Sequence, residues 1–205
     1  MNALPEKKED RRAQYSKRVI REALYELMTE KPGAKITVTE LCRRADVNRS
    51  TFYAFYDDID DLQKKIAREF YILQRDYINR AAALLREKGD ITRLTIDDLQ
   101  QVARIYLTTV KNNETVYRLI FNTHASRAVP RTIDKVYFHV LSEGMDDRMK
   151  AIFRRSFSFV TGGTASLTVS WLETGCAEPI ESLSRTLAYF YNGVFNGQRM
   201  RGGGR

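Results

Sequence analysis

The residues best suited to chemistry form the run Asn-Arg-Ser-Thr-Phe-Tyr that begins at Asn48. Five of these six side chains carry hydrogen-bonding groups. The Arg49 guanidinium can donate two parallel hydrogen bonds to a guanine, or it can pair with a phosphate. We therefore expect this run to bind a nucleic acid. The other side chains able to reach phosphates or base edges are those of Asn48, Ser50, Thr51 and Tyr53.

Sequence signatures of catalysis are missing from the chain. It contains no P-loop, no GxGxxG after a strand, no HExxH and no GxSxG. The two histidines leave few candidates for general acid–base chemistry. Cys42 and Cys176 lie far apart without a CxxC or histidine-spaced partner, which indicates buried thiols rather than a zinc site or a disulfide. We expect no enzyme activity, no cofactor and no metal.

The composition predicts an all-α protein of the cytoplasm. Only four prolines interrupt the chain, and glycine is sparse until the last residues, so long stretches are free to form helix. The charged N-terminus lacks the apolar core of a signal peptide. The uncharged segment 156–172 is interrupted by Ser, Thr and a Gly pair and is too short to span a bilayer. It is therefore interpreted as a helix buried in protein, and no membrane partner is expected.

The formal net charge of +8 is unevenly distributed. Residues 1–56 contain twelve Lys or Arg against eight Asp or Glu, whereas residues 57–198 contain nineteen against eighteen. A basic N-terminal part joined to a nearly neutral body suits a phosphate backbone as partner. A basic arm at the N-terminus could enter a minor groove, or it could be a solvated chain end. Its cations are Lys7, Lys8, Arg11 and Arg12.

Three helices are predicted in the N-terminal part. An apolar stripe with a spacing of three to four residues predicts the first over about 11–31. Thr37 and Glu40 form a capping-box pattern ahead of a short helix over 38–45. After a tight turn, Asn48 is a favourable N-cap for another short helix over about 49–55. The stripe of the first helix consists of Tyr15, Val19, Ile20, Ala23, Leu24, Leu27 and Met28.

The rest of the chain is predicted to be helical as well, so that about nine helices are expected in all. Asp58 can cap a long helix that starts near Ile59, with Asp60 and Asp61 favourable at its positive end. Thr95 and Asp98 form a further helix-start pattern. The predicted helices cover about 59–88, 95–111, 114–122, the segment from Pro130 to about 142, 146–174 and 179–196.

Two short helices joined by a tight turn and preceded by a third form a helix-turn-helix, whose last helix enters the major groove. The segment Ile-Thr-Val-Thr-Glu-Leu-Cys-Arg-Arg-Ala-Asp-Val-Asn-Arg-Ser-Thr-Phe-Tyr-Ala-Phe-Tyr from Ile36 to Tyr56 resembles the DNA-binding head of TetR regulators. The resemblance implies that Thr37 starts the second helix at a phosphate, that Thr51 and Tyr53 touch DNA, and that Phe52 is a core residue. Tyr56 is also expected in the core. The predicted DNA-binding set is Thr37, Thr39, Asn48, Arg49, Ser50, Thr51 and Tyr53.

The segment departs from the family pattern at two positions. Asp46 occupies the turn position that is usually glycine, and Asp tolerates unusual backbone angles better than most residues, so we expect the turn to form. Ile59 stands where a lysine often touches phosphate. That contact is lost, and the acidic run 57–61 would repel DNA if it faced the backbone. Lys64 or Lys65 could compensate.

The body resembles TetR regulators in architecture. Such bodies dimerise through their last two helices, so that two heads read half-sites about 34–36 Å apart. In the penultimate helix, small residues at 162, 163, 166 and 170 share a face that would let helices approach closely. The segment 159–175, with its Trp-Leu-Glu-x-Gly ending, is similar to a TetR C-terminal subgroup common in Firmicutes-type bacteria. The bulky residues expected to support this bundle are Phe153, Phe157, Val160, Leu167, Trp171, Ile180, Leu183, Leu187, Phe190 and Val194.

The resemblance also implies a small effector ligand that enters the body and shifts the spacing of the heads. The candidate pocket residues can equally be ordinary core or surface residues. They are Tyr71, Tyr106, Tyr117, Phe121, His124, His139 and Trp171. The identity of an effector cannot be read from the chain.

The predicted organisation is a basic arm over 1–10, a helix-turn-helix head over 11–58, a helical regulatory and dimerisation body over 59–198 and a flexible Gly-rich tail over 199–205. The expected function is that of a homodimeric, sequence-specific repressor that binds a double-stranded DNA operator and is released by a small ligand. The alternative is a TetR-like regulator or adaptor controlled by a protein partner without a small-molecule inducer. An internal cavity would favour the ligand, and a filled core with an exposed patch would favour the partner.

Overall fold

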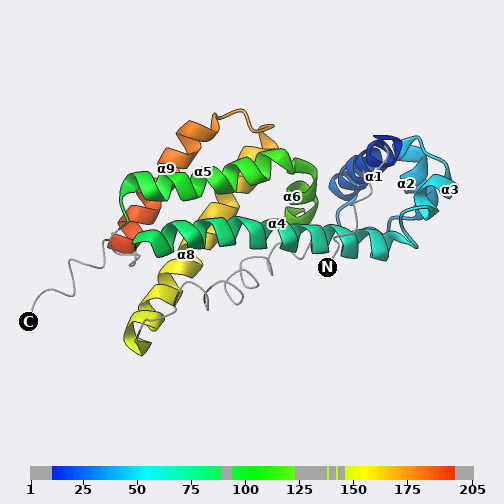
Figure 1. Ribbon diagram of the computed structural model, residues 1–205. Coiled ribbons are helices and arrows are strands. Elements are labelled where there is room, and N and C mark those ends of the chain that lie inside the picture. The colour runs from blue at the N-terminus through cyan, green and yellow to red at the C-terminus, as the bar shows by residue number, and fades with distance from the viewer. Residues whose placement is uncertain (1–10, 89–93, 123–137, 139–141, 143–145, 197–205) are drawn as a thin grey trace, which may run out of the picture. The chain divides into compact units, whose positions relative to one another are not determined.

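The computed structural model describes residues 11–88, 94–122, 138, 142 and 146–196. Every regular element within these residues is an α-helix, and eight helices are present there (Figure 1). The all-α prediction is confirmed, and the helix bounds lie within a few residues of those expected. The helix predicted after Pro130 falls almost entirely outside the described residues. The chain divides into two compact units, 1–68 and 69–205, and each is described by itself.

The first unit contains α1 (Arg11–Glu30), α2 (Val38–Ala45), α3 (Arg49–Tyr53) and the beginning of α4 (Ile59–Lys88). Its core is built from the apolar faces of all four helices. Tyr15 was expected on the stripe of α1, but its side chain is 59% exposed and packs on Arg18 instead. That expectation was wrong because Tyr15 lies on the face opposite Ile20 and Leu24. The buried residues are Ile20, Ala23, Leu24, Leu27, Leu41, Cys42, Phe52, Tyr56, Leu62 and Ile66.

Side-chain caps and one unusual backbone conformation set the ends of α2. The Thr37 hydroxyl accepts a hydrogen bond from the Glu40 amide at 3.2 Å, as the capping-box pattern predicts. Asp46 ends the helix in the left-handed conformation, with φ 51° and ψ 47°. The carbonyl of Cys42 accepts hydrogen bonds from the amides of both Asp46 and Val47. Asp46 therefore adopts the left-handed conformation that glycine usually provides at this turn, as expected.

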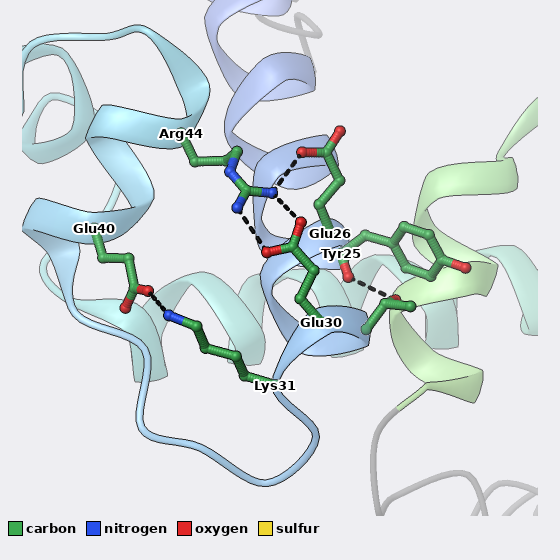
Figure 2. A network of polar contacts seen from close by, with 7 residues as sticks. Tyr25, Glu26, Glu30, Lys31, Glu40 and Arg44 are labelled. Atoms are coloured by element: carbon green, nitrogen blue, oxygen red, sulfur yellow. Dashed lines mark hydrogen bonds and ion pairs between the residues drawn. The ribbon is translucent and has the colours of Figure 1, made fainter.

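Ion pairs on the surface tie α1 to α2 (Figure 2). The Arg44 guanidinium donates to both carboxylate oxygens of Glu30, at 2.6 and 2.7 Å, and to Glu26 at 3.2 Å. The Lys31 ammonium donates to Glu40 at 2.6 Å. These hydrogen bonds are the main reason that the pKa values of Glu30 and Glu40 lie below their usual range.

The second unit contains the rest of α4, α5 (Ile96–Asn112), α6 (Glu114–Phe121), α8 (Asp147–Glu173) and α9 (Ile180–Asn196). Thr95 and Asp98 form a complete capping box at the start of α5. Helices α5 and α9 pack against each other (Figure 1). Glu181 of α9 joins them through its side chain. Its carboxylate accepts from the Gln100 amide at 2.8 Å and from the Arg104 guanidinium at 2.9 and 3.0 Å.

Buried aromatic rings with satisfied hydroxyls occupy the space between α4, α5, α6 and α8. The Tyr117 ring lies 5.3 Å from that of Phe70 and 6.2 Å from that of Phe121. The buried Gln74 amide donates to the Tyr117 hydroxyl at 3.1 Å. The Tyr106 and Thr168 hydroxyls lie 3.0 Å apart, and burial raises the pKa of Tyr106. The helices are thus joined by polar contacts inside an apolar core.

The corner between α8 and α9 is held by the Trp-Leu-Glu-x-Gly segment. Gly175 and Cys176 both adopt left-handed backbone conformations, with φ 66° and 56°. The Trp171 indole donates to the Glu178 carbonyl at 2.8 Å, which fixes the start of α9. The Arg118 guanidinium of α6 donates to the Leu172 carbonyl at 2.5 Å, so a cation lies at the end of α8 where the helix dipole favours it.

The first prediction concerns the Arg44 ion pairs. Replacing Arg44 by Gln should lower Tm by about 1–3 °C at pH 7, the scale of a surface ion pair. Since the pKa of Glu30 is depressed in the folded state, its contribution to stability is present above the ordinary glutamate pKa of 4.5 and is lost as the pH falls through the folded value. The gap between parent and variant should therefore close between about pH 5 and 3, measured by thermal circular dichroism.

Arg43 is the matched control for this variant because it neighbours Arg44 on the same helix and is exposed. Arg43→Gln should leave the Tm and its pH dependence close to those of the parent. An Arg44→Gln variant whose Tm deficit persists unchanged at pH 3 would contradict the role given to the carboxylate of Glu30.

The second prediction concerns the hydroxyl of Tyr117. Tyr117→Phe removes the acceptor of the buried Gln74 amide, and an unsatisfied buried donor costs about 1–3 kcal/mol. Urea unfolding should show this loss, while Tyr71→Phe, at a site that is 50% exposed, should show none. Equal stability of Tyr117→Phe and the parent would mean that Gln74 finds another partner.

Candidate nucleic-acid interface

Helix α3 presents its polar side chains outward. Arg49, Ser50 and Tyr53 are exposed, Thr51 is half-buried, and Phe52 is completely buried. Asn48 takes the N-cap position with an extended backbone, but its side chain makes no capping hydrogen bond. The side-chain amide of Asn48 is exposed and is therefore available to a ligand. The predicted run is thus brought together on one short helix, which ends at Tyr53 rather than near Phe55 as expected.

Phe52 sets the orientation of this helix. Its ring packs edge-on against that of Tyr53 and lies 5.5 Å from that of Tyr56. Tyr56 is 2% exposed, and the Lys65 ammonium lies 5.5 Å from its ring centre. Both residues belong to the core, as expected. Tyr53 is 48% exposed and lies outside it, also as expected.

Arg49 and Tyr53 lie one helical turn apart and contact each other. The Arg49 Nη2 atom donates to the Tyr53 hydroxyl at 3.4 Å. Its guanidinium carbon lies 5.9 Å from the centre of the Tyr53 ring, within the range of a cation–π contact. Their spacing of four residues places them on one side of the helix, and the folded chain brings them into contact.

Helix α2 contributes a second set of exposed groups. Thr37 and Thr39 are exposed, although the Thr37 hydroxyl is already engaged with the Glu40 amide. Arg43 lies one turn after Thr39, so the two residues share a face. Lys35 is exposed in the segment just before the helix. Lys35 and Arg43 were missed as candidates, because the sequence does not say which cations are consumed by internal ion pairs.

Several cations of this unit are held by contacts within the unit, and others are exposed. Lys31 and Arg44 are held by carboxylates of the same unit. Lys65, considered as a replacement for the missing phosphate contact at Ile59, donates to the Phe55 carbonyl and to Asp61, each at 2.8 Å. It is therefore committed to the protein. Lys64 is exposed.

Two of the four aspartates in the run 57–61 have structural roles. The Asp58 carboxylate accepts from the Asp61 amide at 2.7 Å and caps α4, as predicted. The Asp61 carboxylate accepts from the Asp57 amide and from Lys65, and the Lys65 hydrogen bond is the main reason that its pKa is lowered. The carboxylates of Asp57 and Asp60 are exposed. The acidic run thus stabilises the start of α4, independently of any ligand.

The predicted pocket residues of the body do not form a single group. Tyr106, Tyr117 and Phe121 lie together in the aromatic cluster. Tyr71 is half exposed on α4. Trp171 is buried, with its indole bound to the Glu178 carbonyl. His124 and His139 lie outside the described residues.

Helices α8 and α9 expose apolar side chains. Phe159 is 72% exposed, and Gly163, Ser166 and Ser170 follow it at helical spacing on the same face of α8. On α9, Tyr189 and Phe190 are 57% and 56% exposed. Several residues expected to supply bulk to a dimer bundle are instead buried in the core of the same chain. These are Phe153, Trp171, Leu183 and Leu187.

The described residues offer neither a membrane span nor a metal site. No helix among them is long and apolar enough to cross a membrane. No group of three or more His, Cys, Asp or Glu side chains among them could hold a metal ion. Cys42 and Cys176 are free and buried, and burial raises the pKa of both thiols.

Comparison with known proteins points to one class. Residues 97–193 match the family described as "Transcriptional regulator C-terminal region". Two solved structures share the fold at a TM-score of 0.50. A TetR-like transcriptional regulator from Rhodococcus sp. RHA1 is 14% identical over 85% of this chain and 93% of that one. The fatty acid degradation regulator FadR from Bacillus halodurans is 12% identical over 97% and 99%.

A third solved structure, the dihydroxyacetone kinase operon activator DhaS, is 16% identical over 86% of this chain and 93% of its own, with a TM-score of 0.42. No curated protein matches the chain. The two structures with a TM-score of 0.50 establish the fold alone, and the family match concerns residues 97–193.

Proposed function

We propose that the chain is a TetR-family transcriptional regulator, a homodimeric repressor that is released from its DNA operator by a small ligand. In this proposal the first unit is the DNA-binding head and the second is the regulatory and dimerisation body. The observation that carries the proposal is the outward display of hydrogen-bonding side chains on α3, fixed by the buried Phe52. Arg49 and Tyr53 are the central residues of this surface.

The proposed DNA contacts fall into two groups. On α3, Arg49, Ser50 and Tyr53 enter the major groove, with Asn48 and Thr51 at its edge. On and before α2, exposed groups approach the phosphate backbone, which positions the head without reading sequence. These groups belong to Thr37, Thr39, Lys35 and Arg43. The exposed Asp57 and Asp60 oppose binding by charge repulsion.

A titration against the DNA that flanks the gene tests the proposal. Fluorescence anisotropy across a salt series, with unrelated DNA as competitor, should show saturable binding that survives the competitor and weakens steeply with salt. Arg43→Gln should weaken specific and random DNA alike and lower the salt slope by about 1, because it removes one phosphate contact. If specific and random DNA compete equally, and site selection from a random library also yields no motif, the proposal fails.

The proposed dimer interface is the exposed face of α8 together with Tyr189 and Phe190 of α9. A side chain added at Gly162, Gly163 or Gly193 would meet nothing within 4 Å in the same chain, so packing inside the chain does not require glycine there. Small residues beside an exposed Phe159 suit the close approach of a second copy, whose symmetry would pair the two faces.

Phe159→Glu should convert the dimer to monomer at micromolar concentration, because it places two charges in an apolar interface. Sedimentation velocity gives the mass directly. Tyr15→Glu, at an aromatic residue of the head that is 59% exposed, is the matched control and should leave the dimer intact. A parent chain that sediments as a monomer would remove the dimer from the proposal.

Release by a small ligand is supported by the convergence of Tyr106, Tyr117 and Phe121 in the body. The two tyrosine hydroxyls are already hydrogen-bonded within the chain to the uncharged groups of Gln74 and Thr168, so a neutral amphipathic ligand would have to displace these contacts to enter. A small molecule that raises the Tm of the free protein and abolishes operator binding would support release by a ligand over control by a protein partner.

Control by a protein partner is the second candidate function. It is favoured by Tyr71 and Ile72, which are neighbours on α4 and are 50% and 45% exposed. Two exposed apolar side chains on the same turn of a helix offer a surface that another protein could cover.

A further inference from the structure

We infer that Arg49 and Tyr53 form one reading unit, in which Tyr53 positions the Arg49 guanidinium to recognise a guanine in each half-site. This inference rests on the proposed function and deepens it. It names Arg49 as the residue that determines base preference and Tyr53 as a positioning residue. The proposal for the head as a whole requires only that both residues lie at the DNA.

The geometry of the pair supports this assignment. A long, exposed arginine side chain ordinarily samples many rotamers, and ordering it on binding costs conformational entropy. Here the Tyr53 hydroxyl accepts from Arg49 Nη2 at 3.4 Å, and the ring lies under the guanidinium at 5.9 Å. Two separate contacts with one residue therefore restrict the side chain before DNA arrives.

The Tyr53 ring is itself held in place. It packs edge-on against the buried Phe52, with ring centres 5.5 Å apart. Phe52 is 0% exposed and is fixed by the core of the unit. The core thus fixes Phe52, Phe52 holds the Tyr53 ring, and Tyr53 restricts the exposed Arg49 side chain.

Guanine is the base that this arrangement suits. The contact with Tyr53 uses one terminal nitrogen of the guanidinium and leaves donors on the other nitrogens for a ligand. Arginine in the major groove donates in parallel to the O6 and N7 acceptors of guanine, which no other base presents together. Arg49 also lies at the N-terminal end of α3, the part of a recognition helix that contacts base edges.

Site selection from random-sequence double-stranded DNA tests the inference on the full-length chain. The parent should select a motif with one strongly preferred guanine in each half-site. Arg49→Lys keeps the charge but cannot donate two parallel hydrogen bonds to one base. It should therefore lose the preference for guanine over the other bases, which we expect to be roughly 5- to 150-fold in the parent. The rest of the motif should remain.

A double-mutant cycle on the selected operator and on its guanine-substituted version then tests Tyr53. Tyr53→Phe should reduce the preference for guanine by about 2- to 10-fold while lowering affinity for the substituted operator little. In an Arg49→Ala background the same change should have no further effect. Tyr15→Phe, which alters the exposed tyrosine packed on Arg18, is the matched control and should leave both operators unchanged.

The outcomes separate the inference from the function it rests on. If Tyr53→Phe weakens both operators equally, and does so in the Arg49→Ala background, Tyr53 is an independent phosphate contact and the inference is overturned. A motif unchanged in Arg49→Lys overturns it as well. In both cases sequence-specific binding by the parent stands. Only a parent that selects no motif would remove the proposed function itself, with circular dichroism confirming that each variant is folded.

Discussion

The burial of one side chain, Phe52, determines how the first unit presents itself to a ligand. Helix α3 has only five residues, too few to be stable alone, so its position comes from the core into which Phe52 inserts. With Phe52 buried, Arg49, Ser50 and Tyr53 of the same helix remain exposed. The turn before α3 depends on Asp46 in a left-handed conformation, which most side chains adopt only at a cost. The surface that α3 exposes is therefore a consequence of how Phe52 packs in the core of the unit.

The cations of this unit divide between those held by ion pairs within the unit and those left exposed for the proposed DNA contacts. Arg44, Lys31 and Lys65 are each held by carboxylates of the same unit, so the basic excess overstates what is available to a polyanion. The exposed cations Lys35, Arg43 and Arg49 lie on or near the two helices of the motif. The aspartates at the start of α4 cap that helix and weaken the local positive potential. Recognition would then rest on a few well-placed contacts more than on total charge.

The second unit depends on polar contacts inside an apolar core. Gln74 with Tyr117, Tyr106 with Thr168, and Thr164 with Tyr191 at 2.8 Å each join two helices, and burial raises the pKa of Tyr191 to about 12. Such pairs require defined geometry, since an unpaired buried group is costly. They favour one arrangement of the helices over others. A second arrangement with its own set of pairs is what regulation by a ligand or a partner would need.

The helices and the helix-turn-helix could be predicted from the amino-acid sequence, because periodicity, caps and breakers act over a few residues and need no distant partner. Thr37, Asp46, Asp58 and Thr95 could be assigned their roles for that reason. The sequence also indicated that Phe52 is buried and Tyr53 exposed. The folded chain was needed to show that Tyr15 is exposed, that α3 ends at Tyr53, and that Trp171 and Leu187 are buried in their own chain. It alone revealed which cations are paired and that Arg49 meets Tyr53. An amphipathic pattern shows that a face is apolar, but what covers that face depends on helices distant in the chain.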